Sequence, residues 1–144
     1  MSTALVDDRL LAAVLRGERV RVLRGHDLAT TGCWYVRLCG AVMSAAGRTG
    51  TLSGPFRNLP EPERTAALTA VTQLPPTIEL VSLRELAPTI GILRQRHDLN
   101  LLSIEALASA VTLGATVFLT ADTPRLQQAL KAEGCGWHRV DPAG

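Results

Sequence analysis

Three acidic residues, far apart in the chain, stand where catalytic or metal-binding groups of an α/β protein are expected. Asp7 follows an apolar run at residues 3–6, Asp122 follows a second apolar run at residues 115–120, and Glu105 lies in the helical segment before that second run. The carboxyl ends of parallel strands share one edge of a sheet, and ligands of such sheets bind beyond that edge. We therefore expect Asp7, Glu105 and Asp122 to lie together at the carboxyl edge of a sheet.

Gathered carboxylates can do a definite kind of chemistry. Because they repel one another, such groups either take higher pKa values or hold a cation, and carboxylate oxygens are the usual ligands of Mg²⁺ and Mn²⁺. A metal ion held there would activate water and stabilise the charge that develops when a phosphodiester is cleaved. Each acid, taken singly, also fits a structural role: Asp7 or Asp8 as the cap of the first helix, Asp122 as the cap of the last helix, and Glu105 as a solvated side chain.

The elements that would position these acids alternate between strand and helix. The apolar and turn patterns predict strands at residues 3–7, 77–83, 115–120 and 136–140, with residues 19–23 as a short strand or an extended connection. They predict helices at residues 8–17, about 30–46 with Thr30 or Thr31 as N-cap and Gly47 as its end, 60–74, 82–97, 103–114 and 122–134, and a loop at 47–60. This alternation predicts an α/β fold: a small, mostly parallel central sheet in a three-layer α/β/α arrangement.

Length and composition set limits on the class of protein. The 144 residues fit one domain, residues 1–144, that buries a core without disulfides. The three cysteines match no zinc or redox spacing, so we expect buried, reduced thiols. No apolar run is long enough for a membrane helix, and acidic residues interrupt any signal peptide, which predicts a cytoplasmic protein without membrane contact. Fourteen of the fifteen basic residues are arginine, a side chain that suits phosphate, although codon composition explains this bias equally well.

Two stretches carry a resemblance to a known family. The sequences ALVDDRLLAAVLRG near the start and LLSIEALASAVTLGATVFLTADTPRLQQALKAEG near the end resemble the PIN-domain family. The second stretch is the more specific, and the order of helices between the two also fits. The resemblance implies a small parallel sheet flanked by helices and, in active relatives, a metal-dependent ribonuclease that is commonly the toxin of a VapC-like toxin-antitoxin pair.

The resemblance also assigns roles to individual residues. The family's first acid falls on Asp7, its third on Glu105, where aspartate is usual, and its last on Asp122, so that these three would be both catalytic residues and ligands of a weakly held Mg²⁺ or Mn²⁺. The acid that the family carries early in its second helix is missing here, and Arg37 is the only charged residue of that segment. A guanidinium beside the acids would take the place of the cation, so Arg37 is a possible charge partner of Asp7 or Asp122; the alternative is that Arg37 points to solvent.

Two functions of different classes follow. The first is a metal-dependent endoribonuclease of single-stranded RNA, of the toxin-antitoxin type, with the missing acid supplied by Asp8, Asp27 or water. The second is a catalytically inactive PIN-like module that binds RNA or a protein partner. An antitoxin protein and a second copy of the chain are possible partners in either case.

Overall fold

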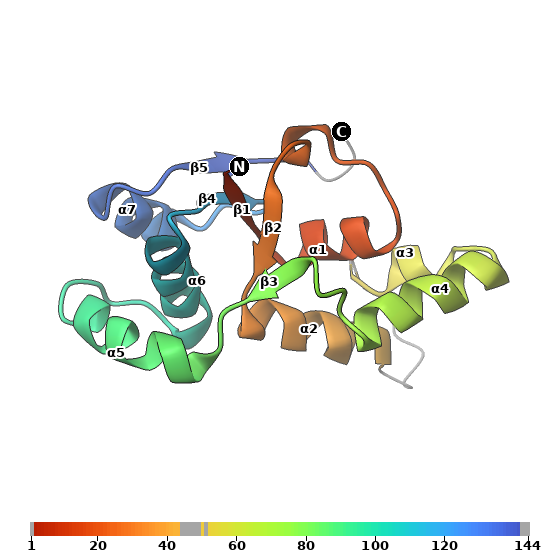
Figure 1. Cartoon of the computed structure of the whole chain (residues 1–144), viewed down its shortest axis with the longest axis horizontal. Coiled ribbons are helices and arrows are strands. Elements are labelled where there is room, and N and C mark those ends of the chain that lie inside the picture. The colour runs from red at the N-terminus through yellow and green to blue at the C-terminus, as the bar shows by residue number, and fades with distance from the viewer. Residues whose placement is uncertain (1, 44–49, 51, 142–144) are drawn as a thin grey trace.

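The computed structural model describes residues 2–43, 50 and 52–141, and its centre is a five-stranded, all-parallel sheet in the order β3-β2-β1-β4-β5 (Figure 1). The strands are β1 (Thr3–Val6), β2 (Asp27–Thr30), β3 (Ile78–Leu80), β4 (Thr116–Leu119) and β5 (Trp137–Arg139). In the middle of the sheet, Leu5 of β1 stands opposite Ala29 of β2 and Val117 of β4. The chain builds the sheet outward from β1 to β3 and then returns to β4 on the other side of β1. The strand order therefore reverses between β1 and β4, which is where α/β sheets of this kind place their ligand sites.

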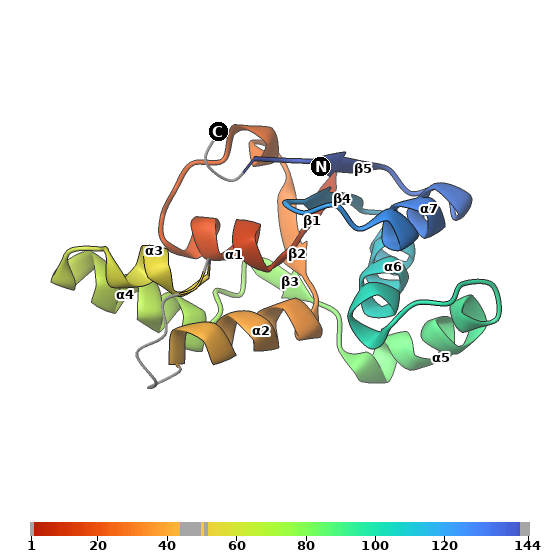
Figure 2. The same ribbon diagram turned by 180° about the vertical axis from the view of Figure 1, so that it is seen from behind.

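Helices cover both faces of the sheet, and the predicted three-layer α/β/α class is confirmed (Figures 1 and 2). The helices are α1 (Asp8–Leu15), α2 (Gly32–Met43), α3 (Gly54–Arg57), α4 (Glu61–Thr72), α5 (Leu83–Arg94), α6 (Leu101–Leu113) and α7 (Pro124–Ala132). One hydrophobic core lies between the sheet and α5, α6 and α7, and a second lies between the sheet and α1, α3 and α4. Helix α2 contributes to both, since Trp34 belongs to the first core and Leu38 to the second.

Local sequence explains where the helices that frame the site begin and end. Asp7 caps α1 by accepting a hydrogen bond from the Leu10 amide, and Asn100 caps α6 in the same way through the Ser103 amide. Helix α6 ends at Gly114, whose φ of 61° is the left-handed conformation that glycine adopts at low cost. These boundaries place the first turns of α1 and α6 at the carboxyl edge of the sheet.

The structure differs from the sequence predictions in three places. The predicted loop at residues 47–60 contains a short helix, α3 (Gly54–Arg57). Residues 19–23 do not form a strand; they contain a short 3₁₀ helix, η1 (Arg21–Leu23). Strand β2 was not predicted, because the segment Asp27–Thr30 holds only two apolar residues, Leu28 and Ala29, and runs directly into the pattern of α2. The predicted helix end at Gly47 lies outside the described residues.

Candidate functional site

A small cavity opens at the carboxyl edge, beyond the ends of β1 and β4. Its volume is about 170 Å³, and its polar lining includes Asp7, Asp8, Arg9, Arg37 and Thr120. Leucines from several elements complete the wall, together with a buried face of Trp34. The cavity thus combines two carboxylates, two guanidinium groups and an apolar wall at the point where the strand order reverses.

Asp7 is a structural acceptor in this site. Its Oδ1 accepts a hydrogen bond from the Leu10 amide at 3.0 Å, and its Oδ2 accepts two from Thr120, one from the backbone N–H and one from the hydroxyl, both at 2.7 Å. The residue is only 5% exposed. Asp7 therefore caps α1, one of the two roles considered for it from the sequence, and the same carboxylate also links the end of β1 to the end of β4.

Asp8 is a buried carboxylate beside that of Asp7. The residue is 7% exposed, and burial, followed by the nearby Asp7 carboxylate, raises the pKa of Asp8, while Arg37 acts in the opposite direction. Arg37 Nε lies 3.4 Å from Asp8 Oδ2, and 59% of the Arg37 side chain is exposed. The predicted pairing of Arg37 with Asp7 or Asp122 is thus wrong, because Arg37 on the second turn of α2 reaches the first residue of α1 instead.

Glu105 is completely buried and faces the beginning of α2 rather than the cavity. Its Oε1 accepts a hydrogen bond from the Cys33 amide at 2.7 Å, where the helix presents unpaired N–H groups and a positive dipole end. Its Oε2 has no hydrogen-bond partner within the described part of the chain. Burial, and then the Glu105 carboxylate, raise the pKa of the Cys33 thiol to about 11. Glu105 is therefore not a solvated side chain.

Asp122 lies at the surface and forms an ion pair with Arg139. Arg139 Nη1 lies 3.0 Å from Asp122 Oδ1, and 72% of the Asp122 side chain is exposed. The cap position of α7 is Thr123, which makes no side-chain capping bond. Asp122 thus forms an exposed ion pair with the end of β5.

The acidic groups do not assemble into a metal-binding set within the described residues. Asp7, Glu105 and Asp122 all belong to the carboxyl edge, but nowhere in residues 2–43, 50 and 52–141 do three His, Cys, Asp or Glu side chains stand close enough to hold one ion. Asp7 is occupied by three protein donors and Asp122 by Arg139, while the free oxygen of Glu105 is sealed in the core. Asp27 cannot supply a fourth ligand because it begins β2, at the opposite edge of the sheet. As arranged, these side chains do not fit a Mg²⁺ or Mn²⁺ site.

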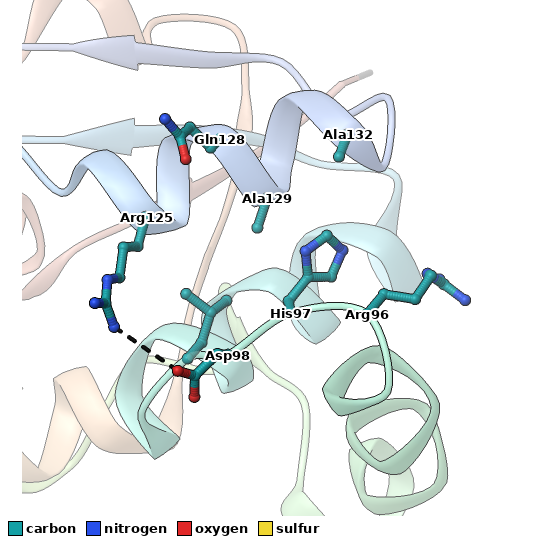
Figure 3. A pocket seen from close by; sticks show the side chains of 8 residues that line it. Arg96, His97, Asp98, Arg125, Gln128, Ala129 and Ala132 are labelled. Atoms are coloured by element: carbon teal, nitrogen blue, oxygen red, sulfur yellow. Dashed lines mark ion pairs between the residues drawn. The ribbon is translucent and has the colours of Figure 1, made fainter.

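A second, larger cavity of about 370 Å³ lies between α7 and the loop after α5 (Figure 3). Arg125 and Asp98 face each other across it at 4.0 Å. His97 turns toward α7, where its Nε2 lies 2.6 Å from Glu133 Oε2, and Arg96 makes two further hydrogen bonds to the Glu133 carboxylate. The charged groups around this cavity are mutually paired and fasten the loop to α7.

Comparisons with known proteins leave the family open. No protein-family model matches the chain, and a search of curated proteins finds no significant match.

Among the described residues, no helix has the length and apolar character needed to cross a membrane. The three cysteines are free thiols as predicted, although each is half-buried rather than fully buried.

Sequence reasoning missed the residues that bind the predicted acids. Thr120 is 113 positions from Asp7, and Cys33 is 72 positions from Glu105, so no local pattern links them. A signal was present in one case: Thr120 ends an apolar strand at the edge where Asp7 was already expected.

Proposed function

We propose that this chain is a PIN-like module that binds a protein partner at the carboxyl edge of its sheet and does not hydrolyse RNA. The observation that carries the proposal is the outer face of α2, beside the carboxyl-edge cavity. Val36 is 68% exposed and Met43 is 61% exposed, the two highest values among the large apolar side chains of the described residues. Seven positions apart, they lie on the same side of the helix.

The composition of this face is typical of a protein interface. Exposed apolar side chains that lie together mark interaction sites, and methionine and arginine are enriched in such surfaces. Arg37 follows Val36 in the chain and lines the carboxyl-edge cavity, so the cavity opens on a neighbouring side of α2, about 100° around the helix from Val36. A partner that covers Val36 and Met43 and extends around α2 would also reach Asp8 and Arg37.

The arrangement of acids favours binding over metal-dependent hydrolysis. Asp8 is compensated by Arg37, Asp122 by Arg139, and Asp7 by the donors of Thr120 and α1. A nuclease site needs carboxylate oxygens free to hold a metal ion and its water. Here the same oxygens hold the strand ends and helix starts in place.

Site-directed photocrosslinking tests the proposal. A benzophenone side chain at position 36 should give one crosslinked protein adduct in the producing cells, and Met43→Asp should abolish the adduct. The matched control is a benzophenone at Ile92, which is 54% exposed on α5 and should give no such adduct. An adduct with twice the chain mass, together with a dimer in sedimentation equilibrium, would identify the partner as a second copy.

Ribonuclease activity is measured on the same protein. Mn²⁺-dependent cleavage of single-stranded RNA that disappears in both Asp7→Asn and Glu105→Gln would overturn the proposal and establish the nuclease. Absence of cleavage, with a position-36 adduct lost in Met43→Asp, is the expected result.

A further inference from the structure

A second surface, at the opposite edge of the sheet, combines an apolar floor with a rim of arginines. A cavity of about 350 Å³ lies between the end of α1 and η1. The floor includes Val14, Val20 and Leu28. A neighbouring cavity of about 410 Å³ is also lined by Val14 and Leu28. The two cavities therefore adjoin at the amino edge of the sheet, and together we call them the amino-edge groove.

Three arginines on this rim make no ion pair with an acid among residues 2–43, 50 and 52–141. Arg19, Arg21 and Arg24 line the cavity and are exposed, and none of them makes an ion pair with any described residue. Glu18, the acid of the 350 Å³ cavity, is paired with Arg16, whose Nε lies 2.6 Å from Glu18 Oε2, and one further acid, Asp27, lines the 410 Å³ cavity. With three such arginines against Asp27, the groove presents a net positive charge around aliphatic side chains.

The amino-edge groove is separate from the carboxyl-edge cavity. Strand β1 runs from one edge to the other, and its four residues span roughly 13 Å at about 3.3 Å per residue. The groove lies where α1 ends and β2 begins, whereas Asp7 and Asp8 lie where β1 ends and α1 begins. A ligand of the groove is thus distinct from the partner proposed for α2.

We propose that the amino-edge groove binds an acidic, amphipathic segment of a protein partner. Carboxylates of the segment would pair with the planar forks of Arg19, Arg21 and Arg24, and its aliphatic side chains would cover Val14, Val20 and Leu28, as in helix-in-groove recognition. Single-stranded RNA is the other polyanion to consider, but it is held largely by stacking of bases on aromatic rings. No aromatic side chain lines the 350 Å³ cavity, and His26 carries the one aromatic ring that lines the 410 Å³ cavity, so the groove offers little surface for stacking of successive bases.

Fluorescence anisotropy with defined probes tests this inference. The probe is a labelled peptide with glutamates and leucines at helical spacing; one control peptide has Gln for every Glu, another has Ser for every Leu, and a labelled single-stranded RNA of similar length is the fourth ligand. Only the Glu/Leu peptide should bind well at physiological salt. Replacing Arg19, Arg21 and Arg24 together by Gln should weaken its binding by at least about tenfold, since three charge contacts of modest strength are lost.

Matched variants make the result specific. Replacing Arg84, Arg94 and Arg125 by Gln removes the same charge from exposed positions on α5 and α7 and should leave peptide binding unchanged, as should Met43→Asp on α2. Val20→Ser should weaken the Glu/Leu peptide severalfold and leave the circular dichroism spectrum unchanged. If the triple groove variant unfolds, single Arg21→Gln and Arg24→Gln variants should each weaken binding by about twofold.

Three outcomes would overturn the inference. The first is no binding of the Glu/Leu peptide. The second is an equal loss in both triple variants, which would mean attraction by net charge only. The third is RNA binding that the groove variant abolishes while peptide binding persists, which would make the groove a nucleic-acid surface. Because α2 is not involved, failure here leaves the position-36 crosslinking result standing.

Discussion

Thr120 joins the ends of two neighbouring strands through Asp7. The Thr120 N–H and hydroxyl both donate to Asp7 Oδ2 at 2.7 Å, and Thr120 directly follows β4 while Asp7 directly follows β1. Because Asp7 also caps α1, one buried carboxylate fixes two strand ends and a helix start. The acid that sequence reasoning assigned to catalysis has this structural task.

Thr120→Val tests the Asp7 crosslink. The substitution keeps the shape of the side chain but removes one donor from a buried carboxylate, and a hydrogen bond to a charged group contributes about 1.5–3 kcal/mol. We expect a loss of that size in the free energy of urea unfolding at neutral pH. Thr120→Ser retains the hydroxyl and should recover most of it; equal losses in both variants would show that the hydroxyl bond is unimportant.

Gly32 and Gly40, both on α2, should respond to alanine in opposite ways. A Cβ at Gly32 would lie 3.0 Å from Glu105 Oε2, whereas a Cβ at Gly40 meets nothing within 4 Å. Glu105 cannot move away freely, because Oε1 is bound to the Cys33 amide. Gly32→Ala should therefore cost about 1–3 kcal/mol by overpacking, and Gly40→Ala should stabilise by about 0.5–1 kcal/mol through helix propensity.

Thermal and urea unfolding of the two glycine variants checks this contrast. A stabilising Gly32→Ala would mean that Glu105 is not held against the start of α2. The outcome would also bear on metal binding, since a movable Glu105 could turn toward the cavity.

Asp8→Asn should stabilise the protein at neutral pH. Because the pKa of Asp8 in the folded state lies above its ordinary value of 3.8, the folded state holds a proton that the unfolded state has already released, and stability falls as pH rises through that interval. The asparagine variant lacks this loss. Its urea midpoint should exceed the wild-type midpoint at pH 7, and the two should converge below about pH 3.8.

Arg37→Gln measures how much Arg37, the ion-pair partner of Asp8, contributes to stability. The Arg37 side chain is 59% exposed and 3.4 Å from Asp8, so the expected destabilisation is below about 1 kcal/mol, and it should vanish in the Asp8→Asn background. Since the described acids do not form a three-ligand set, Mn²⁺ should leave the midpoint of both proteins unchanged. A Mn²⁺-dependent recovery of Arg37→Gln would instead support a cation site at Asp8.

The sequence predicted the frame of the site better than its contacts. The strand ends at Asp7 and Thr120 and the α6 helix around Glu105 follow from apolar periodicity and Gly114, which are local signals. Strand β2 was not predicted because Asp27–Thr30 contains only two apolar residues and runs directly into the helical pattern of α2. The hydrogen-bond partners of the acids could not be predicted for a different reason. Bonds such as Asp7 to Thr120 and Glu105 to Cys33 depend on how distant segments pack. The side-chain type alone does not show whether a carboxylate binds the start of a helix or a metal ion.

The reactivity of Cys33 reports the charge of Glu105. Burial and the Glu105 carboxylate raise the pKa of Cys33 to about 11, so at pH 8 nearly all of Cys33 is the unreactive thiol. Mass spectrometry should show that iodoacetamide labels Cys33 far more slowly than it labels a cysteine in an unfolded peptide. Glu105→Gln removes the negative charge and should accelerate labelling; an unchanged rate would mean that burial alone protects the thiol.

Glu133 should make a pH-dependent contribution to stability, far from the candidate site. Hydrogen bonds from Arg96 and then His97 lower the pKa of Glu133 below its ordinary value of 4.5, and the pair with Arg96 is made by two bonds of 3.1 and 2.9 Å. A lowered carboxylate pKa stabilises the folded state above the unfolded-state pKa, and this contribution is lost as pH falls through the folded-state value. Glu133→Gln should therefore lower the thermal midpoint at pH 6, with a difference that shrinks steadily below about pH 4.5. Glu79→Gln, at an exposed position of β3, is the control and should show little difference at either pH; a Glu133→Gln effect that does not change with pH would mean that packing of the side chain, and not its charge, fastens the α5–α6 loop to α7.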